Sequence, residues 1–201
     1  MVVAMGDRGE WLLVDLPESE QIRAAQNGDR AAYDLLVRRY QKQVYRWAFH
    51  VVRTHDLADE VSQEVFVRTF QALPRIDPDR PLGAWLCRST VNLALNLLRK
   101  QQFRAKWAED NRPDPTDFER KAAEPDAAFR RHRVLGRLEA AIDDLPALYR
   151  TVLLLRLKDG MTYEEIAAAL GISMGTVMSR LARARRRLRA SLGDLIEDLR
   201  Q

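Results

Sequence analysis

The chain has 201 residues, which is enough for one large or two small domains. Its 33 lysines and arginines nearly balance its 29 aspartates and glutamates, so the formal net charge at pH 7 is only +4. The single cysteine, Cys87, excludes an internal disulfide framework and a cysteine-based zinc site. The three histidines, His50, His55 and His132, are scattered and accompany no carboxylate motif, so we interpret them as structural or surface residues. The composition predicts no metal and no cofactor.

Neither end of the chain resembles a targeting signal. Residues 1–16 contain a short apolar piece, Trp11 to Val14, but no basic segment followed by an apolar core long enough for export. Apolar runs elsewhere are far shorter than a membrane span. We therefore expect a cytoplasmic protein without membrane insertion, in which residues 1–17 form a flexible N-terminal arm.

The first predicted long helix spans Ala31 to Arg53, where apolar residues recur at helical spacing. The residues available for its buried face are Leu35, Leu36, Val44, Trp47, Ala48 and Val51. Tyr40 and Tyr45 are interpreted as packing residues rather than as residues that stack on a ligand.

The next predicted helix carries a cluster of outward acids. Asp56 is expected to cap it, and Leu57, Val61 and Val65 face inward at four-residue steps. The polar residues expected on its outer face are Asp59, Glu60, Gln63 and Glu64. Like charges at this spacing repel one another, which favours a docking surface for a basic helical partner. A merely solvated acidic face is the alternative.

A turn over residues 77–83 precedes another helix. Its predicted buried stripe consists of Trp85, Leu86, Val91, Leu95 and Leu98. Five polar or basic residues lie on or near one face of it, and these are Arg88, Asn92, Asn96, Arg99 and Lys100. Amides and cations together suit an unpaired base edge and its phosphates. Asparagines on a solvated helix face are the alternative, and Cys87 is expected to be a small core residue.

An acidic, proline-containing segment divides the chain. Residues 106–130 hold Pro113, Pro115 and Pro125, with many acids among them. Apolar helical spacing returns through Leu135, Leu138, Ile142 and Leu145 and again from Val152 to Leu157. No useful β-alternation occurs. The sequence therefore predicts an all-α fold, with small helical domains at residues 18–105 and 131–201 joined by a flexible linker at 106–130.

The C-terminal part has the pattern of a helix-turn-helix. Thr162 and Glu165 have the spacing of a capping box, which predicts a helix start. Gly171 is suited to the left-handed conformation that ends this helix, and Ser173 to capping the next one. The turn between the two helices is therefore expected to be tight.

The second helix of this pattern combines an apolar stripe with arginines. Val177, Leu181, Ala184 and Leu188 recur at helical spacing. Arg180, Arg183 and Arg187 occupy another face, and Arg185, Arg186 and Arg189 flank it. A helix that enters the major groove reads base edges with its N-terminal residues and meets phosphates with later arginines. We therefore predict DNA contact, with a solvated basic helix as the alternative.

Together these patterns resemble the extracytoplasmic-function (ECF, group 4) sigma factors of bacterial RNA polymerase, within the sigma-70 family. The resemblance covers Ser19 to Leu192. Its most specific motifs are the run from Asp56 to Phe66, the pair Trp85-Leu86 with Asn92, the run from Thr162 to Ala167, and the run from Gly175 to Arg185. They stand in the family's order and spacing. The resemblance implies that residues 18–105 and 131–201 correspond to sigma domains 2 and 4.

The resemblance also implies roles in the first domain. In the family the acidic helix docks on the coiled coil of the polymerase's largest subunit, which assigns core-polymerase binding to Asp56, Asp59, Glu60, Gln63, Glu64 and Phe66. The loop 77–84 and the following helix match the family's reader of the minus-ten element, which holds a flipped base of the opened strand. This assigns minus-ten binding to Arg88, Asn92, Asn96, Arg99 and Lys100.

In the second domain the resemblance implies contacts with the minus-thirty-five duplex. These fall on Thr176, Ser179, Arg180, Arg183, Arg185 and Arg187. Met178 departs from the family's usual basic or polar residue, and a methionine cannot make a bidentate guanine contact. The acidic linker resembles the family's connector, which runs through the polymerase toward the RNA exit path. A solvated acidic tether is the alternative for the linker.

The expected function is that of a transcription initiation factor with no catalysis of its own. Its expected partners are core RNA polymerase, through the coiled coil and the flap, and promoter DNA. The family is held inactive by anti-sigma factors, so the resemblance implies such a partner, which would sequester the chain at the inner membrane. A free-standing helix-turn-helix regulator is the alternative, but no dimerisation helix is evident, and we expect a free monomer. No nucleophile with a base, glycine-rich phosphate loop or paired-carboxylate site indicates an enzyme.

Overall fold

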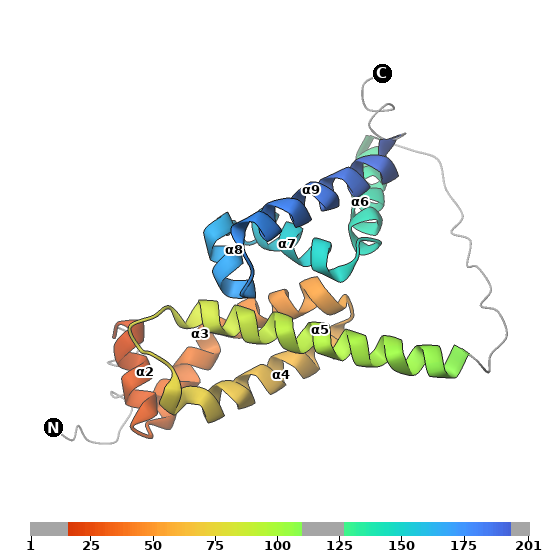
Figure 1. Ribbon diagram of the computed structural model, residues 1–201. Helices are drawn as coiled ribbons and strands as arrows, with labels where there is room; N and C mark the ends of the chain where they lie inside the picture. The colour runs from red at the N-terminus through yellow and green to blue at the C-terminus, as the bar shows by residue number, and fades with distance from the viewer. Residues whose placement is uncertain (1–15, 110–126, 194–201) are drawn as a thin grey trace.

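The computed structural model describes residues 16–109 and 127–193, with side chains described for 16–101 and 134–193. Every regular element in these ranges is helical, which confirms the all-α prediction (Figure 1). The elements are α2 (Glu18–Gln26), α3 (Arg30–Val52), α4 (His55–Ala72), the 3₁₀ turn η1 (Leu73–Arg75), α5 (Leu82–Glu109), α6 (Ala127–Asp143), α7 (Ala147–Leu157), α8 (Tyr163–Leu170) and α9 (Met174–Ser191). None of the helices within the described ranges is both long and apolar enough to cross a membrane.

Helix α3 is the central helix of the first half and contacts α2, α4 and α5. It begins after Asp29, whose carboxylate accepts a hydrogen bond of 3.1 Å from the backbone N–H of Ala32. Val44, Ala48 and Val51 are fully buried along it, as the apolar spacing predicts. The long N-terminal helix is therefore confirmed, with Asp29 as a cap that the sequence reasoning did not name.

Helix α4 and its N-cap lie two residues earlier in the chain than predicted. Thr54 stands at the N-cap position with extended backbone, so the prediction that Asp56 caps this helix is wrong. Asp56 lies instead in the first turn, where its negative charge is favoured by the positive end of the helix dipole. The inward face is confirmed, because Val61 and Val65 are buried.

The helices on both sides run into the predicted linker. Helix α5 continues to Glu109 and α6 begins at Ala127, so residues 106–109 and 127–130 are helical. The first proline of this region is Pro113, so no proline interrupts the described part of α5 inside the predicted linker. The rest of the predicted linker, 110–126, and the predicted arm up to residue 15 lie outside the described residues. The division into two domains stays a prediction.

In the second half, α6 to α9 pack around a core that includes Val152, Ile166 and Leu181. Two apolar residues of the predicted helical spacing are exposed, because Leu135 is 51% and Leu157 64% accessible. Leu157 is the last residue of α7.

The two halves pack on each other along two helix pairs, α3 with α7 and α5 with α8 (Figure 1). Their contact includes a buried ionic group: the Asp159 carboxylate lies 2.5 Å from Arg46 Nε and 3.1 Å from His50 Nε2. Only 2% of the Asp159 side chain is accessible. The interpretation of His50 as structural is consistent with this contact, and no local motif signals its carboxylate partner, because Asp159 is distant in sequence.

Cys87 is a fully buried core residue, as predicted. Burial, together with the charge of Asp159, raises the pKa of its thiol to about 12. A thiol in this state is a poor nucleophile, so the geometry gives Cys87 no reactive role.

Candidate nucleic-acid interface

The helix-turn-helix is formed by α8 and α9, and its predicted caps are present. The backbone N–H of Thr162 donates to Glu165 Oε2 at 2.7 Å, while the N–H of Glu165 donates to Thr162 Oγ1 at 3.1 Å. Gly171 ends α8 with φ of 64°, a left-handed conformation that disfavours side chains. Ser173 Oγ then accepts from the N–H of Thr176 at 3.2 Å, which begins α9. The tight turn is therefore confirmed.

Helix α9 buries Val177, Leu181 and Ala184 against the rest of the second half. At about 100° per residue, one exposed side of the helix then carries five of the six residues predicted to bind the minus-thirty-five duplex. These are Thr176, Ser179, Arg180, Arg183 and Arg187. Arg185 follows Arg183 by two residues, which is about 200° around the helix, so it lies on the opposite flank. The exposed Met178 lies beside it. The structure thus separates Arg185 from the other predicted residues.

The sequence reasoning missed Tyr149, which comes from α7 and reaches this arginine face. Arg183 Nη1 donates to the Tyr149 hydroxyl oxygen at 3.4 Å, and Arg187 Cζ lies 5.8 Å from the centre of the Tyr149 ring. The hydrogen bond from Arg183 lowers the pKa of Tyr149, and the charges of Arg183, Arg187 and Arg180 lower it further. No local pattern in the sequence signals this contact, because 34 residues separate the partners.

The arginine face carries uncompensated positive charge. Among the described side chains, no ion pair involves an arginine of α9. Exposed guanidinium groups that lack internal carboxylate partners are available to external anions such as phosphate. The face therefore has the chemistry needed to bind a nucleic-acid backbone.

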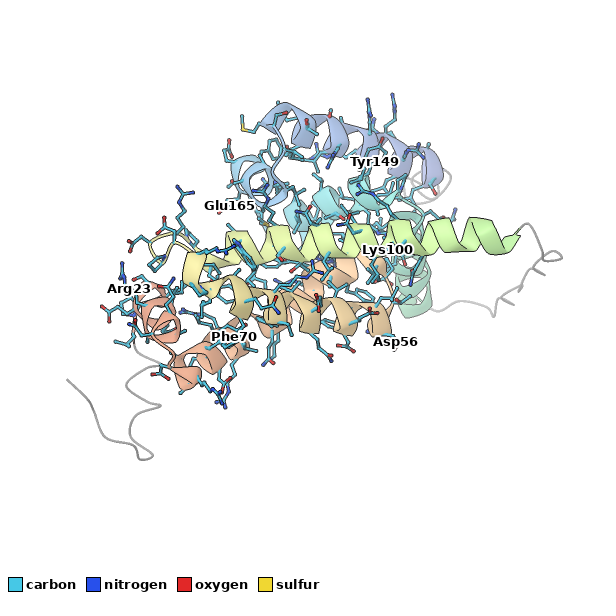
Figure 2. All side chains as sticks on the ribbon, turned by 60° about the horizontal axis from the view of Figure 1, so that its bottom comes forward. Arg23, Asp56, Phe70, Lys100, Tyr149 and Glu165 are labelled. Atoms are coloured by element: carbon cyan, nitrogen blue, oxygen red, sulfur yellow. The ribbon has the colours of Figure 1, made fainter. Side chains whose placement is uncertain are left out.

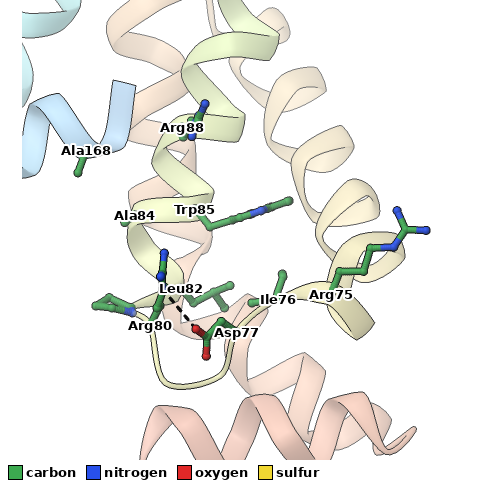
Figure 3. Close-up of a pocket in the computed structure, with 10 residues that line it drawn as sticks. Arg75, Ile76, Asp77, Arg80, Leu82, Ala84, Trp85, Arg88 and Ala168 are labelled. Carbon is green, nitrogen blue, oxygen red and sulfur yellow. Dashed lines mark ion pairs between the residues drawn. The ribbon is translucent and has the colours of Figure 1, made fainter. Parts of the chain in front are cut away.

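A second candidate surface lies where α5 begins. A pocket of about 470 Å³ there is lined by apolar side chains that include Ile76, Leu82 and Trp85. Figure 3 shows Trp85 projecting from α5 above the loop, in which Arg80 pairs with Asp77 at 3.3 Å. Trp85 is half-buried, packing against the core as Leu95 and Leu98 of the predicted stripe do, and it also lines the pocket. A flat aromatic wall with cationic groups around it suits a planar base and its phosphate.

Cationic and amide side chains continue from this pocket along α5. Arg88 lines the pocket, and Asn92, Asn96 and Arg99 follow on the same exposed face, as expected from their spacing. Arg99 Nη1 donates to Asn96 Oδ1 at 3.1 Å, so this asparagine oxygen is already engaged. Lys100 is exposed at the edge of the face. The structure therefore brings the predicted minus-ten residues into one strip.

The two candidate surfaces meet at one point. A Cβ built on Gly171 at the end of α8 would lie 3.1 Å from Arg88 Nη2 of α5. Ala168 of α8 closes one side of the pocket (Figure 3). The helix-turn-helix of the second half thus forms part of the wall of the first half's pocket.

The outer face of α4 carries the predicted acids. Asp56, Asp59, Glu60 and Gln63 are exposed, and Figure 2 shows Asp56 on the side of the molecule that faces away from α7 and α9. Glu64 differs from these residues, because its carboxylate pairs with Arg68 at 2.7 Å.

A groove of about 610 Å³ adjoins this acidic face, between α3 and α4. Its wall includes Tyr45, Asp59 and the half-buried Phe66. Helical spacing also continues the acidic face into Val67 and Phe70, which are 52% and 54% exposed. The sequence reasoning did not assign these two apolar residues to the docking surface. Acid beside exposed apolar area is typical of a protein-binding surface.

The described residues combine helices throughout with a capped helix-turn-helix whose arginines pair with no described carboxylate, an arrangement that suits binding to DNA. The Sigma-70 region 2 family matches residues 36–104, and the family Sigma-70, region 4 matches residues 135–188. The chain therefore belongs to the ECF sigma factors of bacterial RNA polymerase, which direct the polymerase to promoters and so initiate transcription.

Similar proteins carry the same description. The ECF RNA polymerase sigma factor SigE of Mycolicibacterium smegmatis is 36% identical over 169 residues, which are 81% of this chain and 63% of that protein. The RNA polymerase sigma-H factor of Pseudomonas aeruginosa is 30% identical over 192 residues, which are 93% of this chain and all of that protein. The solved structure of CnrH in complex with the cytosolic domain of CnrY has a TM-score of 0.63 and 29% identity, covering 88% of this chain and 97% of CnrH.

Proposed function

We propose that this sigma factor reads the minus-thirty-five duplex with α9 and holds an unpaired base of the minus-ten element in the pocket where α5 begins. The observation that carries the proposal is an arginine face, free of ion pairs among the described side chains, on the second helix of a capped helix-turn-helix. Membership of the family supports both assignments, because regions 2 and 4 are both present in the chain.

Three arginines support contact with duplex DNA. Arg180, Arg183 and Arg187 lie along one side of α9 and project beside Thr176 and Ser179, which are nearer its N-terminus. In a helix-turn-helix the N-terminal residues of the second helix meet base edges, and later cations meet phosphates. Each phosphate that is neutralised releases counterions, which favours binding at low salt.

The pocket beside Trp85 supports minus-ten binding. Its aromatic and aliphatic wall suits the face of a base that has left the helical stack, and Arg88 is placed to meet the adjacent phosphate. Binding an extruded base offsets an unstacking cost of roughly a few kcal/mol. DNA opening would then be driven by binding energy, and we propose that the chain contributes no catalytic step.

The outer face of α4 is the proposed contact with core polymerase. Its exposed acids suit a basic helical partner, as the largest-subunit coiled coil is in the family. Val67 and Phe70 extend the surface with apolar area that a partner would cover. Since the polymerase is its working partner, the proposed location of the chain is the cytoplasm.

An anti-sigma factor is a further proposed partner. The structure of CnrH, which is similar to this chain over most of its length, was determined in complex with the cytosolic domain of CnrY. We propose a comparable inhibitor for this chain, and through it sequestration at the inner membrane.

Transcription by purified core polymerase from a library of genomic fragments, with and without this protein, tests the proposal. Discrete starts that need the protein and share two upstream motifs at fixed spacing are the expected result. Specific duplex binding by the protein alone without new starts would instead favour a free-standing regulator. That alternative gives no reason for the match to region 2.

A further inference from the structure

Tyr149 stands at the side of the arginine face although it belongs to another helix. It lies in the first turn of α7, and its ring is only partly buried (Figure 2). Arg183 and Arg187, one turn apart on α9, contact its hydroxyl and its ring respectively. A hydroxyl and two guanidinium groups therefore converge at one exposed place.

The direction of the hydrogen bond leaves the tyrosine proton free. Arg183 has only donors, so at 3.4 Å it uses a lone pair of the Tyr149 oxygen. The O–H proton must then point to another acceptor, and among the described residues no acceptor is bonded to it. The arginines also lower the pKa of the phenol, which makes its O–H a stronger donor.

The contact with the ring fixes the second arginine. At 5.8 Å from the ring centre, the Arg187 guanidinium is within range of a cation–π interaction. This interaction lowers the freedom of a long side chain and holds the Arg187 guanidinium near the tyrosine ring. No described carboxylate pairs with Arg183 or Arg187, so an anion from outside is the missing partner.

We propose that Tyr149, Arg183 and Arg187 form a single binding site for one backbone phosphate of the duplex that α9 reads. Tyr149 donates its O–H to a phosphate oxygen, Arg183 binds the same phosphate, and the ring orients Arg187 toward it. The proposal rests on the proposed function, because it requires α9 to face duplex DNA. It adds α7 to the DNA-binding surface.

Two substitutions separate the hydroxyl from the ring. Tyr149→Phe removes the donor and keeps the ring, whereas Tyr149→Leu removes both. The affinity of the holoenzyme for a promoter fragment would be measured at several salt concentrations. The measurement would be repeated on a series of duplexes, each of which carries one neutral methylphosphonate at a different backbone position. Leu148→Ala is the matched control, since Leu148 is the exposed neighbour of Tyr149 in α7 and has no group that could donate to a phosphate. Thermal unfolding of each variant checks its folding.

Tyr149→Phe is expected to weaken promoter binding about 3- to 10-fold, the loss of one hydrogen bond. Its salt dependence should stay that of the wild type, because a neutral hydroxyl releases no counterion. Tyr149→Leu should also lower the slope of log affinity against log salt by up to about 0.9, since Arg187 is no longer held. At one backbone position, the methylphosphonate should weaken binding of the wild type more than binding of Tyr149→Phe. The reason is that the neutral phosphate and the substitution remove the same contact.

Equal sensitivity of wild type and Tyr149→Phe at every phosphate would overturn the proposal while leaving promoter reading by α9 intact. A loss confined to certain base pairs would make Tyr149 a base reader and would also overturn it. A wild-type holoenzyme that shows no promoter preference would overturn both the proposed function and this site.

Discussion

Arg150 of α7 donates a 2.7 Å hydrogen bond from Nη2 to the backbone carbonyl of Val51, next to the last residue of α3. Its Nε also donates to the carbonyl of His50 at 3.1 Å. Carbonyls in the last turn of a helix lack intrahelical donors, and a cation is favoured there by the helix dipole. Nη1 of the same arginine bonds to the carbonyls of Asp143 and Leu145 at the end of α6. One buried guanidinium thus caps two helices and joins the two halves.

Replacing this arginine should destabilise the protein strongly. Arg150→Met keeps an unbranched apolar stem in place of the arginine stem but leaves four carbonyls without their donor, at a cost on the order of 3 kcal/mol. Urea unfolding followed by circular dichroism measures this. Arg156→Met is the matched control, because Arg156 makes a single described hydrogen bond, to the carbonyl of Met161, and stacks on Tyr163. Similar losses for the two variants would contradict a special capping role for Arg150.

Asp159 makes the contact between the halves sensitive to acid. Burial opposes its ionisation, but the hydrogen bond from His50 and the charges of His50 and Arg46 outweigh burial and lower its pKa. A carboxyl with a lowered folded-state pKa stabilises the fold above its unfolded pKa of about 3.9, and this contribution is lost as pH falls through the folded value.

The free energy of unfolding measured from pH 7 down to pH 3 tests this. Wild type should lose stability steeply toward the acid end of that range. Asp159→Asn should be less stable at neutral pH, with a shallower acid decline, because it has no proton to take up at this position. Parallel curves for the two proteins would show that another group controls the acid response.

Local patterns predicted the helix-turn-helix well, because each signal and its target are neighbours in the chain. Thr162 caps a helix through Glu165 three residues later, and Gly171 ends it through its own backbone freedom. The contacts of Arg150, Asp159 and Tyr149 join residues from different helices. Helical spacing carries no information on which helices meet, so these contacts could not be predicted.

The same limit applies to the predicted surfaces. The resemblance assigned both Arg183 and Arg185 to the duplex, and their spacing of two residues, about 200° around a helix, places them on opposite flanks of α9. Trp85 was expected in the buried stripe, and it packs against the core but also lines a pocket that α8 helps to form. Val67 and Phe70 were not assigned to the docking surface, and helical spacing alone does not say which apolar side chains another helix covers.

Charge reversal on α4 should prevent association with core polymerase. Asp59→Lys with Glu60→Lys changes two exposed acids and leaves the Glu64–Arg68 pair intact. Repulsion from a basic partner should reduce binding by at least tenfold in a pull-down or by fluorescence anisotropy. The control reverses Glu139 and Asp144, two exposed acids of the second half, with the same change in net charge. Equal binding by both double variants would remove α4 from the polymerase interface.

Trp85 should matter for single-stranded rather than duplex DNA. Trp85→Ala removes the aromatic wall of the pocket and should weaken binding of a single-stranded minus-ten oligonucleotide by about 1 to 3 kcal/mol, the usual value of one stacked base. Binding of the minus-thirty-five duplex should not change. Fluorescence anisotropy with each DNA measures both, and Phe70→Ala, an exposed aromatic on α4, serves as the control. Unchanged affinity for the single strand would show that the pocket holds no base.

Arg183 and Arg185 should differ in their effect on duplex binding. Arg183→Ala removes a cation from the face that carries Arg180 and Arg187, so promoter affinity should fall and the salt slope should decrease by about 0.9. Arg185→Ala changes the net charge equally but acts on the opposite flank of α9. Its effect on affinity and on the slope should be clearly smaller. Holoenzyme binding to the same promoter fragment across a salt series compares the two variants directly. Equal slopes would mean that both flanks of α9 contact phosphates, rather than only the face that lies beside Tyr149.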